Sequence, residues 1–308
     1  MGILILLSAA LATIFFVGAA LIAHTLLHPP RKTFAVALAR LLPTDPQALG
    51  LAFTERRFRL PDGLWSDGWV IQGANAAGPN VIFTHGWADS RFGALTWVPK
   101  IAPSAARIVV YDLRAHGDSP AATCQLGTAE AEDLLALIDQ SDDPPGRGGD
   151  REVVLWGHSL GAATAITAAA LDAKRGTRRV AAVVADGVCR TLTEPVAALL
   201  RSRRLPAFAL VPLARLALAA RLGSGVLRDG LVTDAAALRC PLLLLHGGAD
   251  PICPVTSARR IAVAAGNGHF EIFEGARHGD LADVDPQRYR DVIDRFYASL
   301  PRPRTRAF

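Results

Sequence analysis

The chain has 308 residues, of which 51% are hydrophobic and 20% are charged, and its formal net charge is +5. This length suits one large α/β domain or two small ones, and the apolar fraction is ample for a buried core. The charge is modest and no basic run is interleaved with aromatic residues, so the composition lacks the signature of a nucleic-acid binder.

The first expected element is an apolar helix that covers most of residues 1–28. No charged side chain occurs from Ile3 to Leu27, and a helix of this length can cross a hydrocarbon layer of about 30 Å. A cleaved secretory signal would need basic residues before the apolar run and a small-residue cleavage site after it. Only Met1 and Gly2 precede the run, and no clear cleavage site follows it. The sequence therefore favours an uncleaved membrane anchor, with a cleaved signal peptide as the alternative.

Basic residues after this segment predict how it crosses the membrane. Arg31, Lys32 and Arg40 lie just after the apolar run, and basic residues prefer the cytoplasmic side. We therefore expect a single-pass membrane protein with its N-terminus outside and its main domain in the cytoplasm. Residues 29–50 are expected to form a juxtamembrane linker with one short helix, and residues 301–308 to form a solvated basic tail.

Between residues 51 and 300, short apolar runs alternate with segments of helical periodicity. Such runs suit a parallel sheet that is buried on both faces, and the alternation predicts a doubly wound α/β domain. The expected strands are Phe53–Leu60, Trp69–Ile71, Val81–Phe83, Ile108–Val110, Val153–Leu155, Val180–Val184, Leu242–Leu245 and His269–Phe273. The expected helices include Glu130–Ile138, Leu160–Leu171 and Tyr289–Leu300.

Two stretches interrupt this alternation. Residues 142–151 are rich in Pro, Gly and Asp and are typical of an exposed loop. The longer insert 190–234 is rich in Leu, Ala and Arg and lies between two expected strands, so it does not continue the sheet. We expect it to form a small helical cap, whose apolar faces either lie at a lipid interface or cover a cleft of the domain.

The strongest motif is Gly157-His158-Ser159-Leu160-Gly161, which directly follows an apolar strand and directly precedes a helix-forming run. A serine nucleophile must project from a tight strand-to-helix turn. Glycines two residues to either side let the backbone bend and let the helix pack closely on the strand. The alternative is a glycine-rich turn with an ordinary surface serine. The context of the motif favours Ser159 as a nucleophile.

A serine hydroxyl needs a base, and the base needs an acid to orient it. His278 follows the last expected strand and precedes the last helix, so it is the expected base. Asp250 follows the strand Leu242–Leu245 and is the expected acid, which gives the chain order Ser, Asp, His. Asp186, at the end of the preceding strand, is the rival acid.

The oxyanion that forms during attack needs backbone N–H donors. One expected donor is the amide of Leu160, directly after the nucleophile. The other is the amide of Trp87, in the loop after the strand Val81–Phe83.

Neither a metal nor a cofactor is expected at this site. The cysteines form no C-x-x-C pair and have no histidine at zinc-ligand spacing. They are Cys124, Cys189, Cys240 and Cys253. We expect them to be buried reduced thiols, which agrees weakly with a cytoplasmic domain.

Four segments together carry a family resemblance. They are Thr84-His85-Gly86-Trp87, the run from Tyr111 to Ser119, Gly157-His158-Ser159-Leu160-Gly161 and the run from His246 to Ile252. From about Phe53 to Leu300 the chain resembles the α/β-hydrolase superfamily. More narrowly, it is similar to its membrane-anchored serine hydrolases and to the monoacylglycerol-lipase-like and serine-aminopeptidase-like group.

The resemblance implies an α/β-hydrolase fold with an eight-stranded, mostly parallel sheet. It also implies esterase, lipase, thioesterase or peptidase activity without a cofactor. Ala115 stands where many relatives have glycine, which weakens the assignment to a subfamily. The serine at position 159 argues against the relatives that use aspartate there, such as epoxide hydrolases and haloalkane dehalogenases.

We expect hydrolysis of carboxylic esters with an apolar or lipid-like acyl group, because the cap places apolar surface beside Ser159. A serine aminopeptidase, a thioesterase or an acyltransferase would use the same triad. An alternative from a different functional class is a membrane-bound interaction protein that has the hydrolase fold but no catalytic activity. The expected partners are a small acyl ester and, through the N-terminal helix, a membrane; no nucleic acid is expected.

Overall fold

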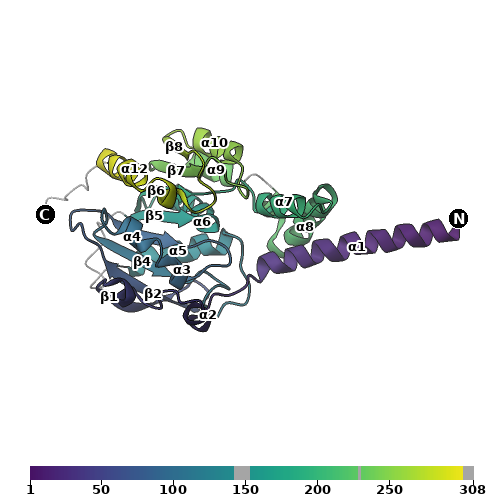
Figure 1. Ribbon diagram of the computed structural model, residues 1–308, viewed down its shortest axis with the longest axis horizontal. Coiled ribbons are helices and arrows are strands. Elements are labelled where there is room, and N and C mark those ends of the chain that lie inside the picture. The colour runs from purple at the N-terminus through teal and green to yellow at the C-terminus, as the bar shows by residue number, and fades with distance from the viewer. Residues whose placement is uncertain (142–152, 228–229, 301–308) are drawn as a thin grey trace.

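One eight-stranded sheet organises the computed structural model, which describes residues 1–141, 153–227 and 230–300 (Figure 1). The strands are β1 (Phe53–Arg59), β2 (Trp65–Gln72), β3 (Asn80–Thr84), β4 (Arg107–Tyr111), β5 (Val153–His158), β6 (Val180–Asp186), β7 (Leu242–Gly247) and β8 (Gly268–Phe273). Their order is β1-β2-β4-β3-β5-β6-β7-β8. β2 runs antiparallel to both neighbours, and the strands from β4 to β8 across the sheet are parallel. The predicted mostly parallel sheet is confirmed.

Helices cover both faces of this sheet. The α-helices are α1 (Gly2–Leu27), α2 (Phe34–Ala39), α3 (Arg91–Ala94), α4 (Val98–Ile101), α5 (Thr128–Gln140), α6 (Leu160–Arg175), α7 (Thr193–Ser202), α8 (Ala207–Leu222), α9 (Gly230–Ala237), α10 (Val255–Ala264), α11 (Leu281–Val284) and α12 (Pro286–Ser299). Two short 3-10 helices are η1 (Pro46–Leu49) and η2 (Ser224–Leu227). One buried cluster joins the sheet to α5, α6, α9 and α10, and a second joins the other face to α3, α4, α11 and α12.

The apolar runs of the central strands explain this two-sided core. In β5, Val154 and Trp156 belong to one cluster, whereas Leu155 belongs to the other. Successive side chains of a strand point to opposite faces, so a strand covered on both sides must be apolar throughout. The loops after β3, β5, β6, β7 and β8 then meet at the carboxyl edge of the sheet, where open α/β folds bind their ligands.

Helix α1 leaves the domain as a straight rod with the N-terminus at its far end (Figure 1). It has 26 residues and is long and apolar enough to cross a membrane. A signal sequence near an N-terminus passes the same test of length and composition. Most of α1 is exposed, but Ala19, Ala23 and Leu27 are buried against the domain. These residues are four apart and therefore share one face of the helix.

The segment after α1, predicted as a juxtamembrane linker, lies against the domain. The guanidinium group of Arg31 donates hydrogen bonds to the carbonyls of Ser119 and Ala121, at 2.5 and 2.6 Å. Lys32 forms an ion pair with Asp89 at 2.7 Å. The segment contains the short helix α2 and also the 3-10 helix η1. These contacts fix the end of α1 to the loops at the carboxyl edge of the sheet.

The insert between β6 and β7 is helical in the part that the structure describes. Helix α8 lies beside α1, and α7 packs on α8 (Figure 1). Helix α9 instead packs on α6, where Thr167 donates a hydrogen bond to Asp234 at 3.0 Å. The cap over the carboxyl edge therefore consists of α7 and α8. The loop predicted at 142–151 and the tail 301–308 lie outside the described residues.

Candidate active site

Ser159 lies at the turn between β5 and α6, with φ 55° and ψ −114°. A positive φ in a residue other than glycine is uncommon and strained, and it concentrates at functional sites. The backbone N–H of Ser159 donates to the carbonyl of Asp186 at 2.9 Å, which fixes the turn to β6. The structure thus has the strand, turn and helix that the motif requires.

The two motif glycines allow α6 to approach the sheet. A Cβ at Gly157 would lie 2.2 Å from the carbonyl carbon of Gly161. A Cβ at Gly161 would lie 1.9 Å from the carbonyl oxygen of Thr84, in β3. Both distances are far below van der Waals contact with backbone atoms, so any larger side chain would displace the helix that begins after Ser159.

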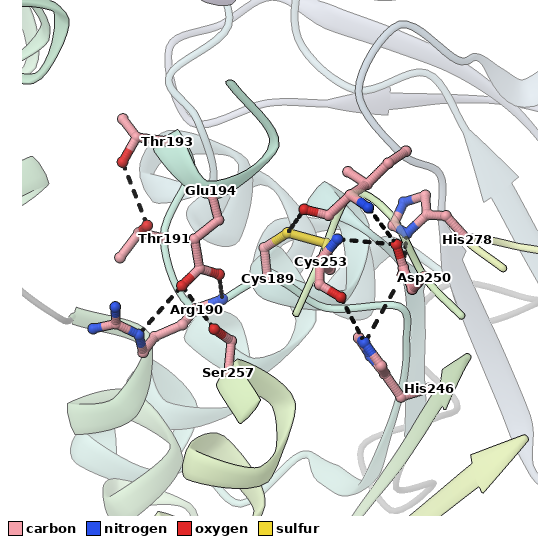
Figure 2. The surroundings of a disulfide bond; sticks show 11 residues. Cys189, Arg190, Thr191, Thr193, Glu194, His246, Asp250, Cys253, Ser257 and His278 are labelled. Carbon is pink, nitrogen blue, oxygen red and sulfur yellow. Dashed lines mark hydrogen bonds and ion pairs between the residues drawn. A yellow bond between two sulfur atoms is a disulfide. The ribbon is translucent and has the colours of Figure 1, made fainter. Parts of the chain in front are cut away.

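His278 and Asp250 form a hydrogen-bonded pair (Figure 2). Nδ1 of His278 lies 2.8 Å from Oδ2 of Asp250. The other carboxylate oxygen accepts from the backbone N–H groups of Ile252 at 2.7 Å and Cys253 at 2.9 Å. Burial raises the pKa of Asp250, but the hydrogen bond and charge of His278 and these two amides outweigh it, so the net pKa is lowered. Asp250 is therefore an anion near neutral pH.

This pairing leaves one imidazole nitrogen for chemistry. Because Nδ1 of His278 faces the carboxylate, Nε2 is the nitrogen left to exchange a proton with another group. His278 and Ser159 line the same cavity. The structure brings a serine at a strained turn and a carboxylate-bound imidazole to one site.

Asp186, the rival acid, has other contacts. Its Oδ2 accepts a hydrogen bond from the hydroxyl of Tyr289 at 3.2 Å. Its Oδ1 lies 3.7 Å from Nδ1 of His158. Burial and the neighbouring carboxylate of Asp186 raise the pKa of Tyr289 well above its usual value, so the phenol remains a donor. Of the two candidate acids, Asp250 is the one in contact with His278.

The amides of Trp87 and Leu160 have no hydrogen-bond acceptor among the described residues. Leu160 opens α6, whose first-turn N–H groups have no partner within the helix. Trp87 is followed by Ala88, which has a φ of 60°. At Gly86, an added Cβ would lie 3.4 Å from Cβ of Ser159, so this loop passes close to the serine. The two amides are available to an oxyanion.

The prediction of reduced thiols is wrong for two of the four cysteines. Cys189 and Cys253 form a disulfide (Figure 2). Cys124 and Cys240 are buried and are not part of a disulfide. The bonded pair is 64 residues apart in sequence. Cys189 follows β6 and Cys253 follows β7, and these neighbouring strands bring their loops together. Only the order of strands in the sheet reveals this pairing.

One group of three side chains in the described part of the chain has metal-ligand atoms within 4.8 Å of one another, namely Asp250, Cys253 and His278. The sulfur of Cys253 is in the disulfide and is not a thiolate, which is the form that binds metals. Asp250 and His278 are bonded to each other. The chemistry of the group is that of a carboxylate–imidazole pair.

A cavity of about 910 Å³ contains the site. This volume lies within the usual range for small-molecule pockets, about 300 to 1,000 Å³. Its apolar lining comes from α1, α6, α7 and the loops after β3, before α5 and after β7. The apolar lining residues include Leu21, Ile22, Leu26, Trp87, Leu126, Leu160, Leu192, Val196, Leu199, Leu200 and Ile252.

Known proteins identify the family of this chain and share its fold. Residues 81–292 match the model of a family described as the alpha/beta hydrolase family. The chain belongs to this family. This α/β hydrolase is 28% identical to the Rv2307c protein of Mycobacterium tuberculosis over 240 residues, which cover 76% of this chain and 75% of the relative. It is 25% identical to the YqkD protein of Bacillus subtilis over 239 residues, which cover 76% and 77%.

Solved esterases share the fold of this α/β hydrolase. The Pyrococcus furiosus esterase Pf2001 superposes with a TM-score of 0.67 and 19% identity, covering 88% of this chain and 99% of that one. The esterase RhEst1 from Rhodococcus superposes with a TM-score of 0.57 and 21% identity, covering 80% and 99%. The resemblance to the superfamily, as read from the motifs, is confirmed.

Proposed function

We propose that this α/β hydrolase is a serine esterase that cleaves carboxylic esters through an acyl-enzyme. The observation that carries the proposal is the 2.8 Å contact between Asp250 and His278 in the cavity that Ser159 lines. A carboxylate on Nδ1 holds the imidazole in the tautomer that can accept a proton at Nε2, as a serine nucleophile requires. The family and the esterase neighbours support a hydrolase.

Each residue then has one task in the reaction. Oγ of Ser159 attacks the ester carbonyl carbon while its proton passes to Nε2 of His278. The amides of Trp87 and Leu160 stabilise the charge on the carbonyl oxygen. The bond to the leaving oxygen breaks, and His278 returns the proton to it. Water then attacks the acyl-enzyme, gives its proton to His278 and releases the acid together with free Ser159.

The cavity favours an acyl ester over the N-terminus of a peptide. An aminopeptidase needs an acidic group for the substrate ammonium. Among the described residues that line the cavity, Asp89 supplies a carboxylate, and Lys32 neutralises it at 2.7 Å. The remaining lining is mostly apolar, which suits a hydrocarbon chain.

We further propose that α1 attaches the protein to a membrane. The exposed apolar residues of α1, such as Ile3, Leu7 and Phe16, would otherwise face water. Two features disagree about which side of the membrane the hydrolase domain lies on. The basic residues after α1 predict the cytoplasm, whereas the disulfide needs an oxidising compartment. We favour the oxidising side, because the charge rule is a statistical bias and a disulfide is a chemical requirement.

Thiol counting tests this placement. The native protein is denatured without reductant in the presence of an alkylating reagent, and the modified cysteines are counted by mass spectrometry. The placement predicts two modified residues, Cys124 and Cys240. Four modified residues would contradict this placement and would favour the cytoplasm, as the basic residues after α1 predict.

The esterase proposal is tested with the full-length protein in detergent and a series of 4-nitrophenyl acyl esters. Wild-type protein should hydrolyse them, and Ser159→Ala should lose the activity while keeping its melting temperature. Ser299→Ala is the matched control, because this serine lies on α12 outside the cavity and donates to the carbonyl of Phe296. Retention of activity in Ser159→Ala would contradict the proposal.

A further inference from the structure

The wall of the catalytic cavity includes the N-terminal helix. Leu21, Ile22, Thr25 and Leu26 of α1 line the same cavity as Ser159 and His278. Ile22 and Leu26 are partly buried, whereas Leu21 is 60% exposed. A helix that only attached the domain to a membrane would not need to reach the reacting groups.

The position of these residues along α1 places the cavity at the edge of a bilayer. At 1.5 Å per residue, the 26 residues of α1 span about 39 Å. The hydrocarbon core is about 30 Å thick and takes about 20 helical residues. If the first 20 residues occupy it, Leu21 stands at the hydrocarbon boundary, and the last turns of α1 extend about 10 Å beyond that boundary.

The cap helix α8 has the surface expected at that depth. It lies against α1, where an added Cβ at Gly18 would come within 3.1 Å of Leu210. Its other side exposes Phe208 and Leu216, and Arg221 lies in its last turn. An exposed apolar face on a helix that ends with an arginine suits a position at the boundary between acyl chains and headgroups.

The end of α1 also holds the loop that supplies an oxyanion donor. The indole N–H of Trp87 donates to the carbonyl of Leu26 at 3.1 Å. One residue later, the carbonyl of Leu27 accepts from the backbone N–H of Cys124 at 2.8 Å. Both carbonyls belong to the last turn of the helix, where no intrahelical donor is left for them. The helix end is thus bonded into the catalytic side of the domain.

We infer that the last two turns of α1 are the acyl-chain wall of the active site, and that the substrate is a long-chain acyl ester taken directly from the bilayer. The inference rests on the proposed esterase activity and adds where its substrate comes from. In this arrangement the ester carbonyl lies at Ser159, and the chain runs along Ile22 and Leu26 toward the exposed side chain of Leu21. Removal of α1 as a signal peptide would remove this wall.

Chain-length selectivity tests the wall in the full-length protein, reconstituted in lipid nanodiscs. A chain that leaves the bilayer exchanges lipid contacts for contacts with this wall, so kcat/KM for a long-chain ester depends on whether the wall can receive the chain. Ile22→Trp puts a larger side chain in the path of the chain. We expect it to lower the ratio of kcat/KM for dodecanoyl to butanoyl esters at least tenfold.

A matched variant on the lipid-facing part of α1 serves as the control. Leu11 is 56% exposed and does not line the cavity, so Leu11→Trp should leave the ratio within twofold of wild type. An unchanged ratio in Ile22→Trp would overturn the wall while leaving the esterase intact. Failure of the esterase proposal itself would give a different result, because the wild-type protein would then hydrolyse neither ester.

A cross-linking measurement tests the same inference on the wild-type protein, so it does not depend on whether a variant folds. A long-chain fluorophosphonate with a diazirine at the end of its chain is attached to Ser159 and then photolysed in nanodiscs. The inference predicts cross-links to the segment of α1 from Gly18 to Leu27. Cross-links confined to other elements, with Ser159 labelled, would overturn it.

Discussion

Asp250→Asn isolates the acid of the proposed triad with little change in shape. In the structure, Oδ1 of Asp250 accepts from the amides of Ile252 and Cys253, and Oδ2 faces Nδ1 of His278. An asparagine can keep the first two hydrogen bonds with its carbonyl oxygen. Its NH₂ group then faces His278 and can only donate, so Nδ1 must be unprotonated. The proton moves to Nε2, which can no longer accept one from Ser159.

The loss follows from this change of tautomer. In the chymotrypsin-type triad, the same substitution lowers kcat roughly 10⁴-fold, or about 5 kcal/mol of transition-state stabilisation. We expect a loss of 10³- to 10⁴-fold in kcat for acyl ester hydrolysis at pH 7. The melting temperature should change little, because the asparagine can keep the two bonds from the amides and can donate the third to His278.

Asp186→Asn is the matched control for this measurement. Asparagine can still accept from the hydroxyl of Tyr289, and Asp186 is not in contact with His278. We expect kcat to fall less than tenfold. The reasoning is refuted if Asp250→Asn stays within tenfold of wild type, or if Asp186→Asn is the more damaging change; the second outcome would make Asp186 the acid.

Four further results are expected. Gly161→Ala should lower the melting temperature by at least about 6 °C, because its Cβ would lie 1.9 Å from the carbonyl oxygen of Thr84; an unchanged transition would contradict the close packing of α6. Trp87→Phe keeps the backbone amide but removes the hydrogen bond to Leu26, so kcat should fall about two- to tenfold for short and long esters alike. A kcat equal to that of wild type would show that this hydrogen bond does not position the oxyanion donor. A chelator such as EDTA should leave activity unchanged, and loss that one metal ion restores would contradict a metal-free mechanism. Membrane fractions should retain the full-length protein through a high-salt wash and lose a form without residues 1–28; a full-length protein that washes off in salt would contradict the anchor.

The pKa of Asp250 adds a dependence of stability on pH. Its folded pKa lies below the usual value of 3.8, so the carboxylate stabilises the fold above that pH. This contribution is lost as the pH falls from the usual value through the lower folded value. The free energy of unfolding of wild type should therefore drop more between pH 5 and 3 than that of Asp250→Asn, as denaturant titrations would measure.

The sheet was predictable from the sequence because its strands are buried on both faces. A run such as Val153 to Trp156 has to be apolar at every position, and this pattern needs no knowledge of neighbours. The serine turn was predictable for a similar reason, since the glycines around Ser159 answer a local steric demand. Ala115 has a φ of 60°, a backbone conformation that suits glycine better than alanine.

Contacts between distant segments were beyond the reach of sequence patterns. Cys189 and Cys253 meet because β6 and β7 are neighbours, and no spacing rule encodes that order. The apolar pattern of α1 is the same for a helix that only crosses a membrane and for one that also lines a cavity. The contact between Trp87 and Leu26 depends on how the helix end docks, which is a property of the folded chain.

Covalent labelling of the native protein tests the central claim most directly. The full-length protein is treated with a fluorophosphonate, digested and mapped by mass spectrometry, with Ser159→Ala treated in parallel. A catalytic serine at the strained turn predicts one phosphonylated site at Ser159 in wild type and none in the variant. A folded wild-type protein that stays unlabelled, or a variant that labels equally well, would contradict the assignment of this chain as a serine hydrolase.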